Sequence, residues 1–300
     1  MKQFFTHILA LLLVVSLVAS EANAQQFSKR KQYNSVGVSL NAMNYFGDIV
    51  PKASIPSLRF AATRPNIGVN ITHRFAPRIS ARVALAYGQI TGDDEKAADK
   101  TDPDARFRYH RNMNFRNNIF EVSAVGIFDL IANRNNYIKR PDFVPYVFAG
   151  VAVFHHNPRG EVRGGDIAGT GVTQGAIVNL QPLRTEGVDY ALTNISIPFG
   201  GGVRYKLNKS FDIGLEIGWR KTFTDYLDDV SGVYIDQAKL GSAEARYFGR
   251  GITRTDDGTF INFNVPGEMR GKGNEKDWYI VTGLNVNYIL APRVKSPKFR

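Results

Sequence analysis

The sequence contains no cysteine and only 13 prolines and 5 histidines in its 300 residues. Without cysteine there is no disulfide-stapled fold, no thiolate nucleophile or metal ligand, and no lipidated N-terminal cysteine. Long apolar runs are also scarce, since the most apolar stretch beyond the N-terminal segment is the short run 143–154, which contains Pro145. That run is too short for a membrane-spanning helix. The remaining composition, with 43% hydrophobic residues, 12% aromatics and 28 glycines, excludes collagen-like and wholly disordered chains.

The N-terminal segment has the pattern of an export signal. Lys2 precedes a mostly apolar run, 4–19, and Ala22-Asn23-Ala24 is a typical cleavage pattern. We expect residues 1–24 to be removed and Gln25 to begin the mature protein. An uncleaved anchor is the alternative, but the apolar run is shorter than the ~20 residues that a spanning helix needs.

The rest of the chain alternates between apolar and polar residues with the period of a β-strand. In the clearest case, 211–220, bulky apolar residues alternate with glycine and charged residues. Residues 144–154 are apolar on both faces, so the phase of that strand stays ambiguous. The predicted strands cover residues 36–42, 67–72, 79–88, 120–129, 144–154, 195–205, 211–220 and 280–290.

The connections between these strands alternate in length. The turns at 76–78 and 208–210 are tight and the connection 131–143 is of medium length, whereas 46–66, 92–117, 155–194 and 224–277 are long. Short turns on one side and long loops on the other are typical of outer-membrane barrels, and hydrocarbon requires such a sheet to close on itself. We therefore predict an all-β fold, an eight-stranded antiparallel transmembrane β-barrel over 25–290, with short periplasmic turns, four long outer loops and a basic periplasmic tail, 291–300.

Aromatic residues are expected to form a belt at each membrane interface. The upper, long-loop belt would contain Tyr45, Tyr87, Phe120, Trp219, Phe223 and Trp278, and the lower belt Phe75, Phe128, Tyr205, Phe211 and Tyr288. A soluble periplasmic sandwich or lipocalin-like barrel is the alternative, with the apolar face turned inward. The mixture of charged residues and glycines on the opposite faces favours the crowded interior of a small membrane barrel.

The charged residues on these inward faces predict an ion-pair network that fills the barrel. An eight-stranded barrel is just wide enough for side chains to fill it, so a structural role is favoured over ion conduction. Glu216 and Arg220, four residues apart on one face, are the expected centre. The predicted network contains Arg82, Glu121, Arg204, Asp212, Glu216 and Arg220.

The formal net charge of +11 is concentrated on the short turns and the chain ends. This basic rim would attract the anionic lipid headgroups of the inner leaflet, or it would dock an acidic periplasmic partner. In that compartment, nucleic acid is not an expected partner. The predicted partner-binding rim consists of Arg74, Arg78, Arg134, Lys139, Arg140, Lys206, Lys209, Arg293 and Lys295.

No catalytic site or cofactor site is expected. His155 and His156 end one strand, with Ser196 on the next, but adjacent strand residues point to opposite faces, so at most one histidine can point inward. The acidic stretch 225–231 offers oxygen ligands for Ca²⁺ but lacks the regular spacing of a calcium loop. Whether it binds Ca²⁺ or serves only loop hydrogen bonds stays open.

Several segments resemble those of the PorG-like outer-membrane β-barrel family of Bacteroidetes. They include 44–48, 64–68, 116–121, 222–231 and 277–279. The family-motif positions that we single out are Asn44, Tyr45, Gly47, Asp48, Asp225, Tyr226, Asp228 and Asp229.

The resemblance implies a non-enzymatic integral protein of the outer membrane that acts in type IX protein secretion or gliding. It implies as partners outer-membrane lipid, a periplasmic ring lipoprotein and associated secretion proteins, which the barrel would anchor. A surface adhesin or ligand-binding barrel, which acts through the long outer loops, is the alternative.

Overall fold

A computed structural model describes residues 31–49, 62–97, 106–163, 171–249, 252–254, 260–262 and 265–291. The expected signal segment 1–24 lies outside the described residues, as do Arg293 and Lys295 of the predicted rim.

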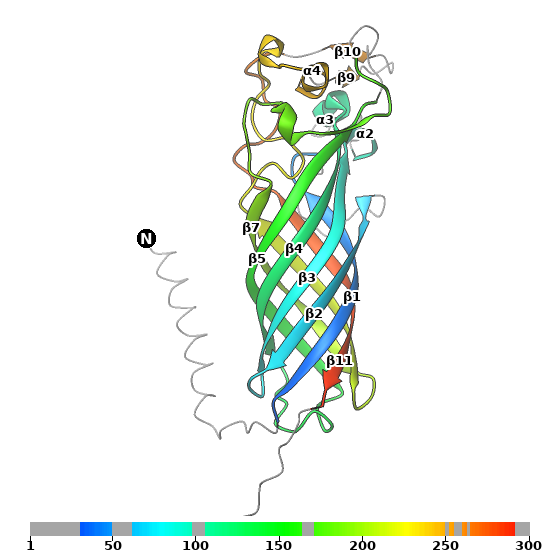
Figure 1. Cartoon of the computed structure of the whole chain (residues 1–300), viewed down its shortest axis with the longest axis vertical. Helices are drawn as coiled ribbons and strands as arrows, with labels where there is room; N and C mark the ends of the chain where they lie inside the picture. Colours follow the sequence, from blue (N-terminus) through cyan, green and yellow to red (C-terminus); the bar gives the residue numbers. More distant parts are fainter. Residues whose placement is uncertain are drawn as a thin grey trace, which may run out of the picture.

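Eight antiparallel strands form a closed barrel, which confirms the predicted fold class (Figure 1). Each strand pairs with its neighbours along the chain, and β1 pairs with β11 from Asn34↔Leu290 to Phe46↔Trp278 to close the cylinder. Short turns join the strands at the lower end in Figure 1, and long loops join them at the upper end. The barrel strands are β1 (Tyr33–Phe46), β2 (Arg64–Arg74), β3 (Ile79–Asp93), β4 (Asn114–Asp129), β5 (Phe143–Glu161), β7 (Thr193–Lys206), β8 (Phe211–Thr222) and β11 (Trp278–Leu290).

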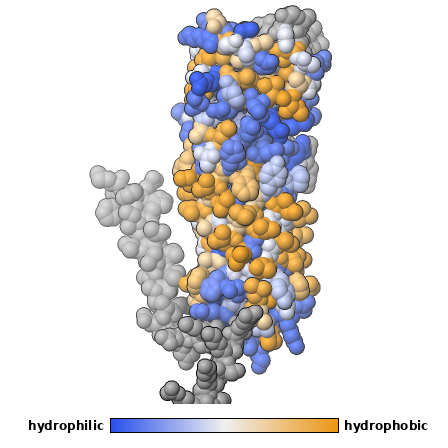
Figure 2. Space-filling view, viewed as in Figure 1, coloured by the Kyte–Doolittle hydropathy of each residue, from blue (hydrophilic) through white to orange (hydrophobic). Residues whose placement is uncertain are grey.

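The outward face of the barrel is apolar. Leu40 has 68% of its surface exposed, and Ile67, Val151 and Leu284 are similarly open. A soluble domain would bury such side chains, because each exposes apolar area to water. Figure 2 shows a hydrophobic band across the face in view, with more hydrophilic regions above and below it. This outer belt consists of Val38, Leu40, Ile67, Val69, Ile71, Val83, Leu85, Val122, Val147, Val151, Val153, Ile195, Ile197, Leu215, Leu284 and Val286.

One side of the barrel is taller than the other. Strands β3, β4 and β5 continue beyond their predicted ends and rise above the belt toward the outer loops (Figure 1). The alternation of apolar and polar residues weakens in these extensions, so the sequence did not mark them as strand. The outer loops add α2 (Asp94–Ala97), α3 (Arg106–Arg111), β6 (Ile177–Asn179), η3 (Gln181–Leu183), η4 (Gln237–Lys239), α4 (Ala243–Gly249), β9 (Ile252–Arg254) and β10 (Phe260–Asn262). Among the described residues, no helix has the length and apolarity to cross a membrane.

The interior is more apolar than predicted. Val125, Ile127, Tyr146 and Phe148 form one buried cluster inside the barrel, which also settles the phase of β5. A larger cluster closes the upper mouth: Met43, Tyr45, Ile49, Ile90, Phe115, Ile119, Phe154, Leu227, Val230 and Tyr279. The assignment of Tyr45 to an outer aromatic belt was therefore wrong, since its ring is 2% exposed and points inward.

Candidate functional site

Buried arginines close the lower end of the barrel. The carboxylate of Asp129 is fully buried and accepts hydrogen bonds from Arg74 Nη1 at 2.7 Å and from Arg204 Nη2 at 2.7 Å. The carboxylate of Asp212 accepts from Arg140 Nε at 2.9 Å and Nη2 at 2.7 Å. Charges removed from water need such partners, so these groups hold one another in place and fill the mouth.

The placement of Arg74 and Arg140 on an exposed rim is corrected by this arrangement. Their residues are 2% and 5% exposed, because the buried carboxylates of Asp129 and Asp212 draw them inside. Arg140 also donates to the main-chain oxygens of Tyr137, Asn208, Lys209 and Phe211. It therefore ties the β4–β5 turn to the β7–β8 turn, and it is a structural clamp rather than a surface charge.

The other described residues of the predicted rim remain at the surface. Arg134, Lys139 and Lys209 are exposed, Arg78 donates to the main-chain oxygen of Leu130 at 2.6 Å, and Lys206 pairs with Asp142 at 3.2 Å. Exposed apolar side chains accompany them, namely Leu130, Ile131, Ile138 and Leu207. We call Arg78, Arg134, Lys139, Lys206 and Lys209 the lower rim.

Ion pairs cross the middle of the lumen. Arg82 on β3 holds Glu216 on β8 through two hydrogen bonds of 2.7 and 3.0 Å. Arg220 on β8 faces Glu121 on β4 at 3.3 Å. Glu216 and Arg220 thus both lie in the interior as expected, but each pairs with a residue on another strand and not with the other. Periodicity assigns a face to a residue, whereas its partner across the lumen depends on how the sheet closes.

Tyrosines extend this network. Tyr146 donates to Glu216 at 2.9 Å, and Tyr279 donates to Glu121 at 2.6 Å. Arg82 and Asn285 line two small cavities in the lumen. Of the predicted network, Arg82, Glu121, Glu216 and Arg220 meet in this middle layer, while Arg204 and Asp212 belong to the lower layer.

The two family-motif segments meet at the upper mouth. Tyr45 Oη lies 2.7 Å from Asp228 Oδ2 and 2.8 Å from Asp277 Oδ1, and all three side chains are buried. A phenol has one proton to donate, so one of the two carboxyl groups must carry a proton to complete both hydrogen bonds. Gly47 is required here, because a Cβ at this position would overlap Tyr45 Oη and Asp277 Oδ1.

Burial sets the protonation of these loop carboxyls. It raises the pKa of Asp228 well above its usual range, and the negative charge of Asp48 adds to this rise. It raises the pKa of Asp277 in the same way, with Asp228 as the next cause. The pair therefore binds a proton more strongly than carboxyls in water do, which matches the geometry around Tyr45.

The remaining motif residues fix the segment after β8 against the other outer loops. Asp229 has a φ of 69° and accepts hydrogen bonds from Thr185 and Tyr190, both at 2.6 Å. The rings of Tyr226 and Tyr190 stack at 4.5 Å, and Asp225 accepts from Ser231 at 2.6 Å. Asn44 accepts from Thr63 at 3.0 Å, and Asp48 accepts from the main-chain nitrogen of Lys272 at 2.9 Å. These contacts explain why the motif is polar although the residues are buried.

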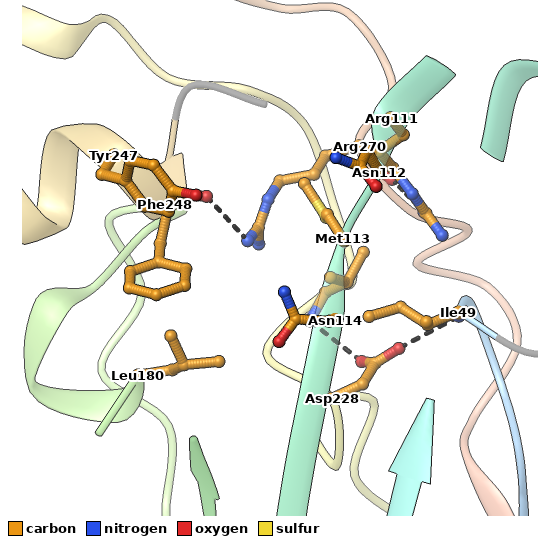
Figure 3. A pocket seen from close by; sticks show the side chains of 11 residues that line it. Ile49, Arg111, Asn112, Met113, Asn114, Leu180, Asp228, Tyr247, Phe248 and Arg270 are labelled. Carbon is orange, nitrogen blue, oxygen red and sulfur yellow. Dashed lines mark hydrogen bonds between the residues drawn. The ribbon is translucent and has the colours of Figure 1, made fainter. Parts of the chain in front are cut away.

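The buried cluster around Tyr45, Leu227 and Val230 that closes the upper mouth is called the plug. A small pocket lies beside it, beneath the outer loops (Figure 3). Arg111 and Arg270 lie side by side at its edge, with the Arg270 side chain directed toward Phe248, and Tyr247, Phe248 and Leu180 form its apolar wall. Both arginines already have carboxylate partners: Arg111 binds Asp94 at 2.8 Å, and Arg270 binds Glu186 at 2.8 Å. The pocket therefore carries little uncompensated charge for a ligand.

The histidine pair does not form a catalytic arrangement. His155 points outward and lies 3.1 Å from Thr193, whereas His156 is fully buried and its two ring nitrogens face the amides of Asn117 and Asn194. In the described part of the chain, neither a carboxylate nor the hydroxyl of Ser196 is hydrogen-bonded to His156. Within the same residues, no group of three or more histidine and carboxylate side chains is placed to hold a metal ion.

Comparison with known proteins gives a family match. A sequence model described as a domain of unknown function (DUF6089) matches residues 6–168. This region runs from the N-terminal segment through β5 and includes one of the two motif segments that meet at the upper mouth. A search of curated proteins found no match.

Several solved structures are similar in fold. The outer membrane protein OprG from Pseudomonas aeruginosa aligns with a TM-score of 0.40 and 7% identity over 89% of this chain and 100% of its own. Ail of Yersinia pestis aligns at 0.39 and 7% identity, over 87% and 99%. Neisserial surface protein A aligns at 0.36 and 10% identity, over 85% and 96%.

Proposed function

The chain belongs to the DUF6089 family, and from this premise we propose that it is a non-enzymatic outer-membrane barrel that anchors periplasmic components of the type IX protein secretion machinery. The observation that carries the proposal is the division of the molecule into an apolar outer belt, a filled lumen and an exposed basic lower rim.

The outer belt supports the membrane location. Its side chains are 39 to 68% exposed on all sides of the cylinder, and the strands have the length that a tilted crossing of a bilayer needs. In lipid this surface replaces contact with water by contact with acyl chains. The closed pairing from β1 to β11 leaves no open edge in hydrocarbon.

The filled lumen supports a role as an anchor. Three layers of buried groups stand along the axis: Asp129 with its arginines, the Arg82–Glu216 pair, and the Tyr45 plug. A barrel so occupied acts through its ends and not through a channel. At the lower end, the five basic residues of the lower rim lie on or beside three short turns, next to exposed leucine and isoleucine side chains. Such a surface suits an acidic protein partner such as a periplasmic ring lipoprotein.

The test reverses the charge of the exposed rim. In the variant Arg134→Glu, Lys139→Glu and Lys209→Glu, the barrel still inserts, since all three side chains lie outside it. We expect loss of co-purifying periplasmic proteins and loss of secretion. The matched control carries the same charge change at the opposite end, in Arg184→Glu, Lys239→Glu and Lys272→Glu, and keeps both. Normal secretion by the lower variant would exclude the anchoring role.

A surface adhesin is the second candidate, and one observation favours it. Val233, Val265 and Met269 are 47, 44 and 60% exposed on the outer loops, and Val233 and Met269 pair in an isolated β-bridge. Exposed apolar side chains of this kind on the outer loops suit contact with another molecule. If the protein is an adhesin, substituting all three residues by serine should abolish adhesion. If it is an anchor that binds its partner through the lower rim, the same substitutions should leave secretion unchanged.

A further inference from the structure

On the taller side of the barrel, formed by β3, β4 and β5, the chemistry of the outward-facing residues changes with height above the outer belt. The strand register places residues of β3, β4 and β5 side by side in rows, two residues apart along each strand. Because alternate residues share a face, every row points outward like the belt residues below it. From the belt upward, the rows are Leu85–Val122–Val153, Tyr87–Phe120–His155, Gln89–Asn118–Asn157 and Arg116–Arg159.

The two lower rows have the composition of a lipid interface. Leu85, Val122 and Val153 are 42 to 49% exposed and belong to the outer belt. In the next row, Tyr87 and Phe120 remain about half exposed beside His155. Aromatic rings concentrate where acyl chains give way to headgroups, so this row marks the upper boundary of the hydrocarbon.

The third row consists of amides. Gln89 donates to Asn118 at 2.8 Å, and Asn157 donates to Asn179 of β6 at 3.3 Å. These side chains are partly exposed, so further donor and acceptor positions face outward. Amides can both donate hydrogen bonds to hydroxyl groups and accept them, so this row is chemically suited to sugars. In Figure 2 the surface above the hydrophobic band is correspondingly hydrophilic.

The top row places two arginines directly opposite each other. Arg116 on β4 and Arg159 on β5 are cross-strand partners, and like charges in such positions repel. Arg116 is partly compensated by Glu161 at 3.0 Å, which also binds Arg163 at 3.3 Å. Arg159 forms no ion pair with any carboxylate of the described residues. This row therefore has an excess positive charge that an external anion would satisfy.

From this juxtaposition we propose that the outward face of β3, β4 and β5 binds a phosphorylated glycolipid of the outer leaflet, with its acyl chains on the belt, its sugars on the amide row and a phosphate on Arg116 and Arg159. The spacing fits. At ~3.3 Å per residue, the arginine row lies about 13 Å along the strands above the aromatic row, and strand tilt reduces this to about 10 Å along the membrane normal. That height is within the headgroup layer. The proposal rests on the outer-membrane location proposed above.

Lipid retention in nanodiscs tests this site. The full chain and the variant Arg116→Gln/Arg159→Gln are inserted into phosphatidylcholine discs that contain a small fraction of diphosphoryl lipid A, and bound lipid is measured by native mass spectrometry. Two lost charges should weaken lipid A binding roughly thirtyfold, since each basic residue near an anionic surface contributes about fivefold. The matched control, Arg134→Gln/Lys139→Gln, removes two charges at the opposite end and should retain lipid A like the unmodified chain.

Two further comparisons make the assignment decisive. Dephosphorylated lipid A with the same acyl chains should bind weakly, and phosphatidylglycerol should not replace lipid A. The proposal would be overturned if the unmodified chain retained dephosphorylated lipid A or phosphatidylglycerol as well as it retains lipid A. It would also be overturned if the Arg116/Arg159 variant, with an unchanged unfolding midpoint, retained as much lipid A as the unmodified chain. Failure of the unmodified chain to enter discs at all would instead overturn the membrane location.

Discussion

Tyr45 on β1 and Asp228 in the loop after β8 are joined by a 2.7 Å hydrogen bond, although 183 residues separate them. The bond seals the upper mouth, because it fixes the loop segment around Leu227 and Val230 inside the barrel. The first and last thirds of the chain therefore share one buried core above the outer belt.

Removal of the Tyr45 hydroxyl should loosen this seal. Tyr45→Phe keeps the ring but leaves two buried carboxyls without their common partner, at a cost of about 1–3 kcal/mol in the free energy of unfolding. Thermal unfolding in detergent micelles measures the change. The control Tyr87→Phe, which alters an exposed ring on the outward face of β3, should leave the midpoint unchanged. Equal shifts in the two variants would contradict the role of the hydroxyl.

A methyl group at Gly47 should have a similar effect for a steric reason. Gly47→Ala pushes a Cβ into Tyr45 Oη and Asp277 Oδ1, and overpacking of this kind costs about 1–3 kcal/mol. Gly241→Ala is the matched control, since a Cβ there meets no atom within 4 Å. We expect a lower unfolding midpoint in the first variant alone, and an unchanged midpoint would refute the close packing inferred at Gly47.

The stability of the outer plug should fall as the pH rises. Burial raises the pKa of Asp225 from 3.8 to about 6, so over that interval the folded protein holds a proton that the unfolded chain has released. Each deprotonation in this window favours the unfolded state, and the stabilising contribution is lost once the pH passes the folded pKa. Asp225→Asn should flatten this part of the curve of unfolding midpoint against pH. A midpoint that rises over the same interval would show that the sign is wrong.

The central ion pair should behave as a unit. Arg82→Gln leaves Glu216 buried without its cation, which typically costs about 3–5 kcal/mol, and Glu216→Gln does the reverse to Arg82. The double variant removes both charges, so we expect its unfolding free energy in urea to lie closer to that of the unmodified protein than either single variant does. Simple addition of the two single effects would indicate that the pair contributes no coupling.

The strands could be predicted because their two faces differ chemically. Along β8, Phe211, Leu215 and Trp219 alternate with Asp212 and Glu216, and this period holds only for a sheet. The upper parts of β3, β4 and β5 lack that contrast, since residues such as Gln89 and Asn118 are polar on the outward face too. The sequence therefore indicated where the apolar outer belt lies, but not how far the strands extend beyond it.

Pairings across the lumen could not be predicted from the sequence. The inward position of Arg82 followed from its neighbours, but its partner Glu216 depends on the order β3-β2-β1-β11-β8 around the closed sheet. Arg74 shows the same limit, because a basic residue beside a turn has the composition of a surface charge. Only the buried Asp129 across the lower mouth explains why it lies inside.

The Arg82–Glu216 bridge also limits the order in which the molecule can assemble. Its two ends stand on opposite walls, and three strands separate them in either direction around the ring. They can meet only once the sheet has curled into a cylinder, so before that stage both charges need water or other partners. Formation of this bridge, with loss of the water around both charges, therefore belongs to a late step of folding.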